Sequence, residues 1–323
     1  MKRSPFIESV RKELRTRHYS LQTEKTYLYW IKSFIIFNEK QHPEKMGNHE
    51  IERFLNYIAT TRGVAASTQN QALCAIIFLY RYVIKRDITD LSYSFAKRAK
   101  RLPTVLSPEE VNSILKNCSD KYWLIIALLY GCGFRVSEVL SLRIKDIDLN
   151  NRSILVFNGK GAKDRYTLLP NSLVSKLKEQ IDDVKQLHEK DVNEGFGFTS
   201  LPPSLHRKYK NTLKDFSWQY IFPSTTRCTH PYDGYICRHH LHPTAFTKQL
   251  RLAVIKSGIH KRVTAHTFRH SFATQLLING SDIRTVQELL GHTDIRTTEI
   301  YTHVVGNRCA GTASPVGFLV KTG

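Results

Sequence analysis

Helix-start signals recur along this chain and constrain its fold more than any other feature. Ser4-Pro5 combines an N-cap residue with a proline at the first helical position, and Ser20 precedes an apolar pattern that runs to about Lys40. Asn48 begins a third pattern, and a fourth covers residues 66–85. Four helices within ~85 residues predict a compact bundle. The pattern suggests a DNA-binding bundle, with a protein-interaction bundle as the alternative that has the same pattern.

The second half of the chain begins with a capping box, Ser107-Pro108-Glu109-Glu110. Residues 152–157 and 165–169 are typical of two strands around a Gly/Lys turn, and helical patterns occupy much of the rest. The fold class predicted is mainly α with a small β-sheet. A length of 323 residues allows about two domains. We predict a helical domain over 1–88, a basic linker over 89–103 and a second domain over 104–323.

The charge of the chain points to a polyanionic partner. A formal charge of +20 and a pI near 9.7 favour nucleic acid, because each neutralised phosphate releases condensed counterions. The longest apolar run, residues 122–134, is too short to span a bilayer and ends at Arg135. The first residues lack the apolar core of a signal peptide. A cytoplasmic location is therefore expected.

The predicted linker carries its own basic group. Lys97 and Arg98 lie in it together with Lys100 and Arg101. A basic strap between two domains would follow the phosphate backbone while the domains close around a duplex. A solvated linker without DNA contacts would have the same composition.

Six residues carry the chemistry of phosphodiester transfer, in the order Arg135, Lys160, His266, Arg269, His292 and Tyr301. The transferred phosphate spreads negative charge over its oxygens, and a guanidinium matches two of them at once. Arg135 and Arg269 suit that role. A tyrosine hydroxyl has a pKa of ~10, so Tyr301 needs cations and a base in order to attack phosphorus.

Spacing supports this grouping. His266, Arg269 and His270 fall at i, i+3 and i+4, so they share one helix face after a capping Thr264, and His266 is the predicted base. Lys160, in the hairpin turn, would protonate the departing 5′ oxygen. His292 follows Gly291, a helix-ending glycine, and is expected on the loop before Tyr301.

Each of these residues taken singly has a structural alternative. A tyrosine or arginine is more often a core or surface residue, and His266 with His270 would also fit half a metal site. A zincin motif is excluded because Thr267 stands where its glutamate would be. The joint occurrence of all six residues favours the catalytic interpretation.

The phrases that carry these residues resemble those of the tyrosine recombinase superfamily, which includes the Xer and phage integrases, and most closely the integron integrases. They include Glu138, three residues after Arg135, and Gly291-His292-Thr293-Asp294 before Tyr301, and the match begins near the phrase at residues 20–27. The resemblance implies an N-terminal core-binding (SAM-like) domain, a recombinase catalytic domain and a 3′-phosphotyrosyl intermediate. It implies no metal and no cofactor, with a homotetramer acting on two DNA sites.

Residues 191–242 form an insertion that the catalytic parts do not require. It is broken by glycines and prolines and rich in aromatic and basic side chains, which suit stacking with unpaired bases. Phe216, Trp218, Tyr220 and Phe222 alternate, so a strand would place them on one side as a small core, with Trp218 the exception. His239 and His240 cannot both point inward on an extended segment.

Integron integrases are similar in this insertion. The resemblance implies that it reads bases flipped out of a folded single-stranded hairpin. The residues expected to contact DNA there are Trp218, Pro231, His239 and His240, with Pro231 as an apolar wall. The implied activity is insertion and excision of gene cassettes by strand exchange.

The alternatives to this function are a duplex-specific Xer or phage integrase, a non-catalytic DNA-binding regulator, and a type IB topoisomerase. The six cysteines are scattered, which is typical of reduced intracellular thiols. Cys228 and His230, with Cys237 and His239, lie close enough in sequence to suggest zinc, but their CxH spacing is not the usual one. We expect no metal there.

Overall fold

The computed structural model describes residues 4–88, 102–157, 164–201, 208–209, 212–231 and 233–307. The chain divides into two compact units, Met1–Arg101 and Leu102–Gly323. The predicted domain boundaries remain predictions, since their junction lies outside the described residues. No helix in the described part of the chain is both long and apolar enough to cross a membrane.

The N-terminal unit is helical throughout its described residues. Its elements are α1 (Pro5–Thr16), α2 (Leu21–Phe37), the 3-10 turn η1 (Pro43–Lys45), α3 (Asn48–Thr60), α4 (Ala66–Phe78) and the π-helical η2 (Leu79–Ile84). The hydroxyl of Ser20 accepts a hydrogen bond from the Thr23 amide at 3.1 Å and so caps α2, whereas the side chain of Ser4 makes no such bond to α1. The predicted helix starts at Pro5 and Asn48 are confirmed.

The predicted fourth helix changes its winding before it ends. The segment 66–85 is helical, but from Leu79 it widens into a π-helix and stops at Lys85, which has a left-handed φ of 59°. Tyr80 and Phe34 lie in the core of this unit with their rings 6.4 Å apart. Burial of each such aromatic side chain contributes roughly 1.5–3 kcal/mol.

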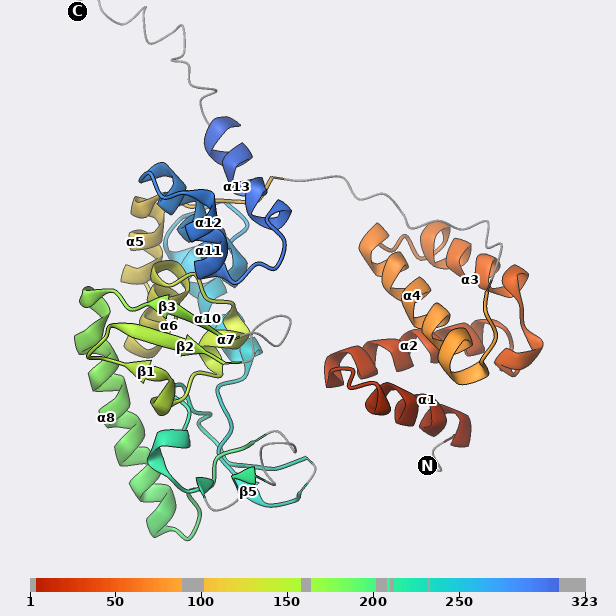
Figure 1. Ribbon diagram of the computed structural model, residues 1–323, viewed down its shortest axis with the longest axis horizontal. Helices are drawn as coiled ribbons and strands as arrows, with labels where there is room; N and C mark the ends of the chain where they lie inside the picture. Colours follow the sequence, from red (N-terminus) through yellow and green to blue (C-terminus); the bar gives the residue numbers. More distant parts are fainter. Residues whose placement is uncertain are drawn as a thin grey trace, which may run out of the picture. The chain divides into compact units, whose positions relative to one another are not determined.

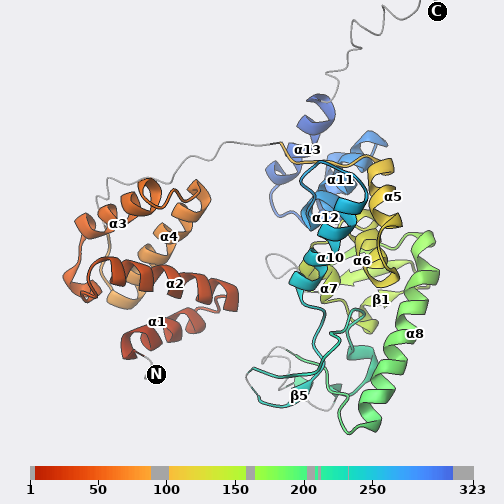
Figure 2. The ribbon, with the colours of Figure 1, turned by 180° about the vertical axis from the view of Figure 1, so that it is seen from behind.

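The second unit is mainly helical with two small sheets. It contains α5 (Pro108–Lys116), α6 (Asp120–Gly131), α7 (Val136–Leu140), η3 (Ile144–Asp146), β1 (Ile147–Asp148), β2 (Ser153–Val156), β3 (Arg165–Leu168), α8 (Asn171–Asn193), η5 (Phe216–Trp218), β4 (Cys228–Thr229), β5 (Ile236–Cys237), α10 (Pro243–Lys256), α11 (Ala265–Ile278), α12 (Ile283–Leu290) and α13 (Arg296–Asn307) (Figure 1; Figure 2 from behind). The capping box at Ser107 is confirmed, because its hydroxyl accepts from the Glu110 amide at 3.2 Å and its amide donates to Glu110 at 2.8 Å. The predicted fold class, mainly α with a small sheet, is confirmed.

The predicted hairpin is present. Strands β2 and β3 pair antiparallel with Ile154 opposite Thr167, and β1 adds a third strand beside β2. A second antiparallel pair, β4 and β5, was not expected. Lys160, in the turn between β2 and β3, lies outside the described residues.

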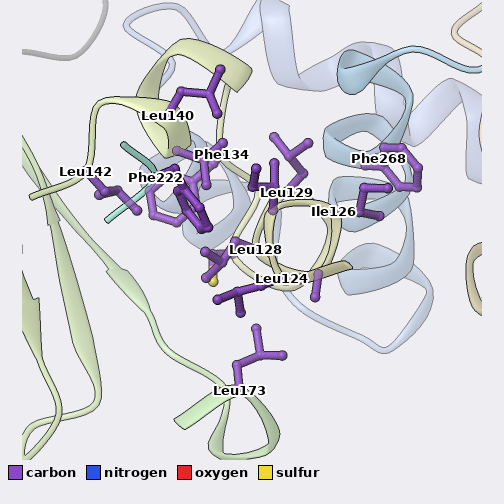
Figure 3. Close-up of a cluster of buried hydrophobic side chains, with 14 of the residues drawn as sticks. Leu124, Ile126, Leu128, Leu129, Phe134, Leu140, Leu142, Leu173, Phe222 and Phe268 are labelled. Atoms are coloured by element: carbon purple, nitrogen blue, oxygen red, sulfur yellow. The ribbon is translucent and has the colours of Figure 1, made fainter. Parts of the chain in front are cut away.

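Helix α6 forms the centre of the core of this unit. Its apolar run is buried against α11, and Leu124, Leu128 and Phe134 pack in one cluster with Phe268 and Phe222 (Figure 3). The chain then turns at Gly133, where a Cβ atom would lie 2.5 Å from the Phe272 ring and where φ is +66°. Only glycine fits this turn, which places Arg135 immediately beyond the core.

The insertion departs from the sequence prediction in two respects. The alternating aromatic residues do not form a strand, because Phe216–Trp218 is a 3-10 turn held by hydrogen bonds from the Trp218 amide to Asp215 and from the Gln219 amide to Phe216. Tyr220 and Phe222 are buried as core residues, whereas Phe216 and Trp218 are half-buried. Helix α8 continues to Asn193, so the irregular chain begins after the predicted residue 191.

Candidate active site

Helix α11 presents three functional side chains on one face. It begins after Thr264, whose amide donates to the Thr267 hydroxyl at 3.0 Å, and it carries His266, Arg269 and His270. Arg269 is 3% exposed, and its guanidinium donates to the carbonyls of Gly133 and Leu290, each at 2.5 Å. These bonds tie α11 to the turn before Arg135 and to the end of α12.

A buried carboxylate holds the arginines together. Glu138 accepts from the Arg135 guanidinium at 2.6 Å and from the Arg165 guanidinium at 3.0 and 2.8 Å, and Arg269 lies 3.9 Å away. Desolvation raises the pKa of Glu138, but the hydrogen bonds from Arg165 and from the Arg135 amide outweigh it and lower the pKa to about 2. The carboxylate is therefore charged at neutral pH and orients Arg135.

Arg269 stays charged although it is buried. Desolvation and the nearby Arg135 lower its pKa to about 9, which Glu138 partly offsets. At neutral pH the site thus holds Arg135 and Arg269 as fixed cations, which suits the oxygens of a phosphodiester.

The hydroxyl of Tyr301 meets an imidazole on α11. Tyr301 is 2% exposed on α13, and its Oη lies 3.0 Å from Nδ1 of His270. Desolvation raises the pKa of Tyr301, while Arg269 and Arg135 lower it in part. Desolvation, then His266 and Arg269, lower the pKa of His270 to about 4. At neutral pH the phenol therefore stays protonated and donates a hydrogen bond to a neutral imidazole.

His292 lies on the turn before α13, as predicted from the glycine that precedes it. Gly291 ends α12 with φ of +63°. Nε2 of His292 lies 3.1 Å from the Arg269 guanidinium, and Nδ1 lies 2.9 Å from the Thr298 hydroxyl. Because a guanidinium only donates, Nε2 accepts and Nδ1 carries the proton. The His292 ring is nearly parallel to that of Tyr301, with centroids 6.5 Å apart.

These side chains surround one cavity of about 320 Å³. It brings together the predicted residues Arg135, His266, Arg269, His292 and Tyr301, and His270 lines it as well. Its other lining residues are Gly291, Thr293, Arg296, Thr297 and Ile300. Arg296 adds a further cation that sequence reasoning did not single out.

In the insertion, Arg143 lies beside Tyr220 and Trp218, and the rings of His239 and His240 pack near Tyr220. The Arg143 guanidinium lies 4.2 Å from the centroid of the Tyr220 ring, hydrogen-bonds the Tyr220 hydroxyl at 2.9 Å, and bonds the Trp218 carbonyl. The rings of His239 and His240 lie 5.5 and 5.4 Å from that of Tyr220 and 4.0 Å from each other. Trp218, His239 and His240 are thus brought to one place.

The remaining predicted DNA-binding residues have different surroundings, and Trp218 has two further neighbours. The Lys145 ammonium lies 4.3 Å from the centroid of the Trp218 ring, and Tyr209 packs against the same ring with centroids 4.9 Å apart. Pro231 is exposed after β4, and the contacts recorded among the described residues do not join it to this group. Lys97 and Arg98 lie outside the described residues.

The cysteines of the insertion lie close together without a metal-site geometry. Cys228 and Cys237 face each other across β4 and β5 with their sulfurs 4.0 Å apart. Within the described ranges no three His, Cys, Asp or Glu side chains are placed to hold a metal ion.

Four residues of these sites, His270, Arg165, Arg143 and Arg296, were not predicted as site residues from the sequence. His270 was placed on the correct helix face, where it would converge with His266 and Arg269 on one phosphate, but it was not named as catalytic; its spacing from His266 was the available signal. Arg165 and Arg143 carry no local signal, because their partners Glu138 and Tyr220 are distant in sequence.

Comparison with known proteins places this fold and site. The model of the phage integrase family matches residues 104–308, and that of the phage integrase N-terminal SAM-like domain matches residues 6–90. The chain belongs to the phage integrase family. It is a tyrosine recombinase, and therefore a site-specific DNA recombinase, as its sequence resemblance had implied.

Individual relatives agree. An integrase/recombinase of Escherichia coli is 43% identical over 97% of this chain and 93% of its own length. A tyrosine recombinase XerC of Lactobacillus delbrueckii is 30% identical over 81% of this chain and 79% of its own length. The crystal structure of XerH bound to its difH substrate is 25% identical with a TM-score of 0.61, covering 94% of this chain and 81% of XerH. A lambda integrase dimer bound to a core site is 18% identical and has the same fold, with a TM-score of 0.63. The match covers 93% of this chain and 95% of the lambda integrase chain.

Proposed function

We propose that Tyr301 is the nucleophile of this recombinase. In cleavage Tyr301 loses its phenolic proton to an imidazole of the cavity, the bond from its Oη to phosphorus forms, the bond from phosphorus to the 5′ oxygen breaks, and a 3′-phosphotyrosyl bond remains. Lys160 gives its proton to the departing 5′ oxygen. A strand joins by the reverse steps, so no high-energy cofactor is consumed.

The observation that carries this proposal is the shared cavity. Tyr301 lies in it beside Arg135 and Arg269, whose charges would bind the phosphate and stabilise the negative charge that grows in the transition state. His292, held by Arg269 and Thr298, lines the same cavity, and His266 lines it as well. These roles require no metal ion.

The nucleophile is tested by substitution. Tyr301→Phe removes one hydroxyl, so DNA binding should persist while the covalent protein–DNA product disappears. A nicked, end-labelled site traps the product, which denaturing electrophoresis detects. Tyr166→Phe, a change of the same kind at an exposed tyrosine on β3, is the matched control and should keep the covalent product. A covalent product from Tyr301→Phe would overturn the assignment.

The insertion suggests the substrate class. We infer that the chain is an integron-type integrase that inserts and excises gene cassettes, acting as a homotetramer on two DNA sites. The supporting observation is the ring group around Arg143: Trp218, His239 and His240 present flat faces beside the cations Arg143 and Lys145. Such faces suit bases flipped out of a folded single-stranded hairpin.

The imidazoles of this group are neutral, which suits bases more than phosphates. Desolvation lowers the pKa of His239 to about 4, with the neighbouring His240 and Arg143 adding to the effect, and desolvation also lowers the pKa of His240. Nδ1 of His240 lies 2.8 Å from the Leu241 carbonyl and so carries the proton, which leaves a lone pair on Nε2. Neutral rings recognise bases by stacking and hydrogen bonds.

Binding measurements test the hairpin proposal. Trp218→Ala and His240→Ala should each weaken binding to a bulged hairpin by ~1–3 kcal/mol and binding to fully paired duplex far less. Phe216→Ala, which removes a half-buried ring of the same turn, is the matched control. Equal weakening on both DNAs, with loss of thermal stability, would show that the rings form a structural cluster.

A duplex-specific Xer or phage-type integrase is the second candidate. The observation that favours it is the likeness to XerC and XerH over most of the chain. Equal cleavage of a paired duplex and of a folded hairpin of the same sequence would support this second candidate.

A further inference from the structure

The imidazole that contacts the proposed nucleophile belongs to His270. Its Nδ1 lies 3.0 Å from Oη of Tyr301, with the two ring centroids 5.6 Å apart. His266, one helical turn earlier, is exposed, and its ring lies 6.0 Å from that of His270. The base predicted from the sequence was His266, whereas the geometry favours its neighbour.

The protonation states of Tyr301 and His270 define which of the two donates the hydrogen bond. Burial keeps the Tyr301 phenol protonated, because its pKa is raised, and keeps His270 neutral, because its pKa is lowered to about 4. A neutral imidazole with its proton on Nε2 accepts at Nδ1. The phenolic proton of Tyr301 must leave before Oη attacks phosphorus. That proton already forms a hydrogen bond to the lone pair on Nδ1 of His270.

We propose that His270 is the proton acceptor for Tyr301 in cleavage and the proton donor to it in rejoining. The proposal rests on the role of Tyr301 as nucleophile. In the forward step the O–H bond of Tyr301 breaks, its proton moves to Nδ1 of His270, and Oη bonds to phosphorus as the 5′ oxygen leaves with the proton of Lys160. In the reverse step the imidazolium returns that proton to Oη.

The surroundings of His270 explain how such a base is switched on. The charged and titratable groups that face it are His266 and Arg269 on its own helix, Tyr301 and Arg296 on α13, His292 on the preceding turn and Arg135 before α7. Burial, followed by the nearby His266 and Arg269, lowers the pKa of His270 and holds the free imidazole neutral. A bound phosphate adds negative charge beside it, which makes the imidazolium more stable and proton transfer easier.

Chemical rescue tests the proposal. His270→Ala should slow single-turnover formation of the covalent product by roughly 100- to 10,000-fold, the usual contribution of a general base. Added imidazole should restore part of that rate, and more basic imidazoles should restore more. His270→Asn, which keeps a polar group near the Nδ1 position without basicity, should stay slow. Its rate should rise with pH where the wild type has levelled off.

Comparisons of variants and substrates distinguish proton acceptance by His270 from a role of Lys160 or His266. A substrate with sulfur in place of the 5′ oxygen should rescue Lys160→Ala, because a thiolate leaves without a proton, but not His270→Ala. Wild-type rates in His270→Asn, rescue of His270→Ala by the sulfur substrate, or imidazole rescue confined to His266→Ala would each overturn the inference. DNA affinity and circular dichroism of both His270 variants report whether they fold. If His270→Ala does not fold, His270→Asn decides.

The same assay distinguishes failure of the inference from failure of the proposed function. A covalent product from Tyr301→Phe would overturn the nucleophile and with it the role of His270. Absence of that product, together with a wild-type rate and pH profile in His270→Asn, would overturn the role of His270 alone.

Discussion

At the scale of single residues, Glu138 is the carboxylate that joins the arginines of the site. Its side chain is 8% exposed and bonds two arginines, with a third close by. Removing one partner of a buried ionic network usually costs more than the network contributes, because the remaining charges stay buried. Here three guanidinium groups would remain without their shared carboxylate.

Glu138→Gln should therefore destabilise the catalytic unit by about 3 kcal/mol at pH 7, and Arg135 should bind phosphate less well. The folded carboxyl has a pKa of about 2, below its ordinary 4.5, so its contribution is complete above about pH 4.5 and is lost as the pH falls toward 2. Urea denaturation of both proteins at several pH values measures the difference. Glu179→Gln, at an exposed carboxylate, is the control. A difference that persists unchanged at low pH would contradict this account.

At the scale of elements, Arg165 joins three parts of the site. It lies at the start of β3, bonds Glu138 in α7, and donates to the Leu289 carbonyl at 3.0 Å near the end of α12. Gly291 lies directly against it: a Cβ atom there would be 2.8 Å from Cδ of Arg165. The hairpin, the arginine cluster and the turn that carries His292 therefore depend on one another.

Gly291→Ala tests this dependence. The left-handed φ of +63° alone costs roughly 1 kcal/mol, and the new methyl group would also displace Arg165. Gly258→Ala is a matched control, since Gly258 has φ of +67° and open space around its Cβ position. Both variants should lose similar backbone stability, but only Gly291→Ala should cleave DNA more slowly, by about tenfold or more. Equal cleavage by the two would show that Arg165 does not couple these elements.

At the scale of the whole molecule, the net positive charge should determine how DNA affinity depends on salt concentration. The net charge of +20 is spread over a catalytic unit, a helical unit and the linker between them. Non-specific attraction of this kind depends on salt, whereas stacking of neutral rings does not.

Lys97→Ala combined with Arg98→Ala should flatten the dependence of log affinity on log salt by about 1.8, at ~0.9 per phosphate contact. Trp218→Ala should weaken hairpin binding and leave that slope nearly unchanged, because an indole neutralises no phosphate. Titrations at several salt concentrations measure both. An unchanged slope in the linker variant would mean that Lys97 and Arg98 stay solvated.

The sequence alone determined the local features of this protein. Caps at Ser107 and Gly291, the hairpin strands and the shared face of α11 depend on neighbours within a few positions, so their patterns are legible without a structure. The tertiary structure decided which groups meet. Arg269 reaches a carbonyl 136 positions away, and His270 meets Tyr301 across 31 positions. Such contacts arise from how helices pack, which no short-range pattern encodes, and they moved the proposed base from His266 to His270.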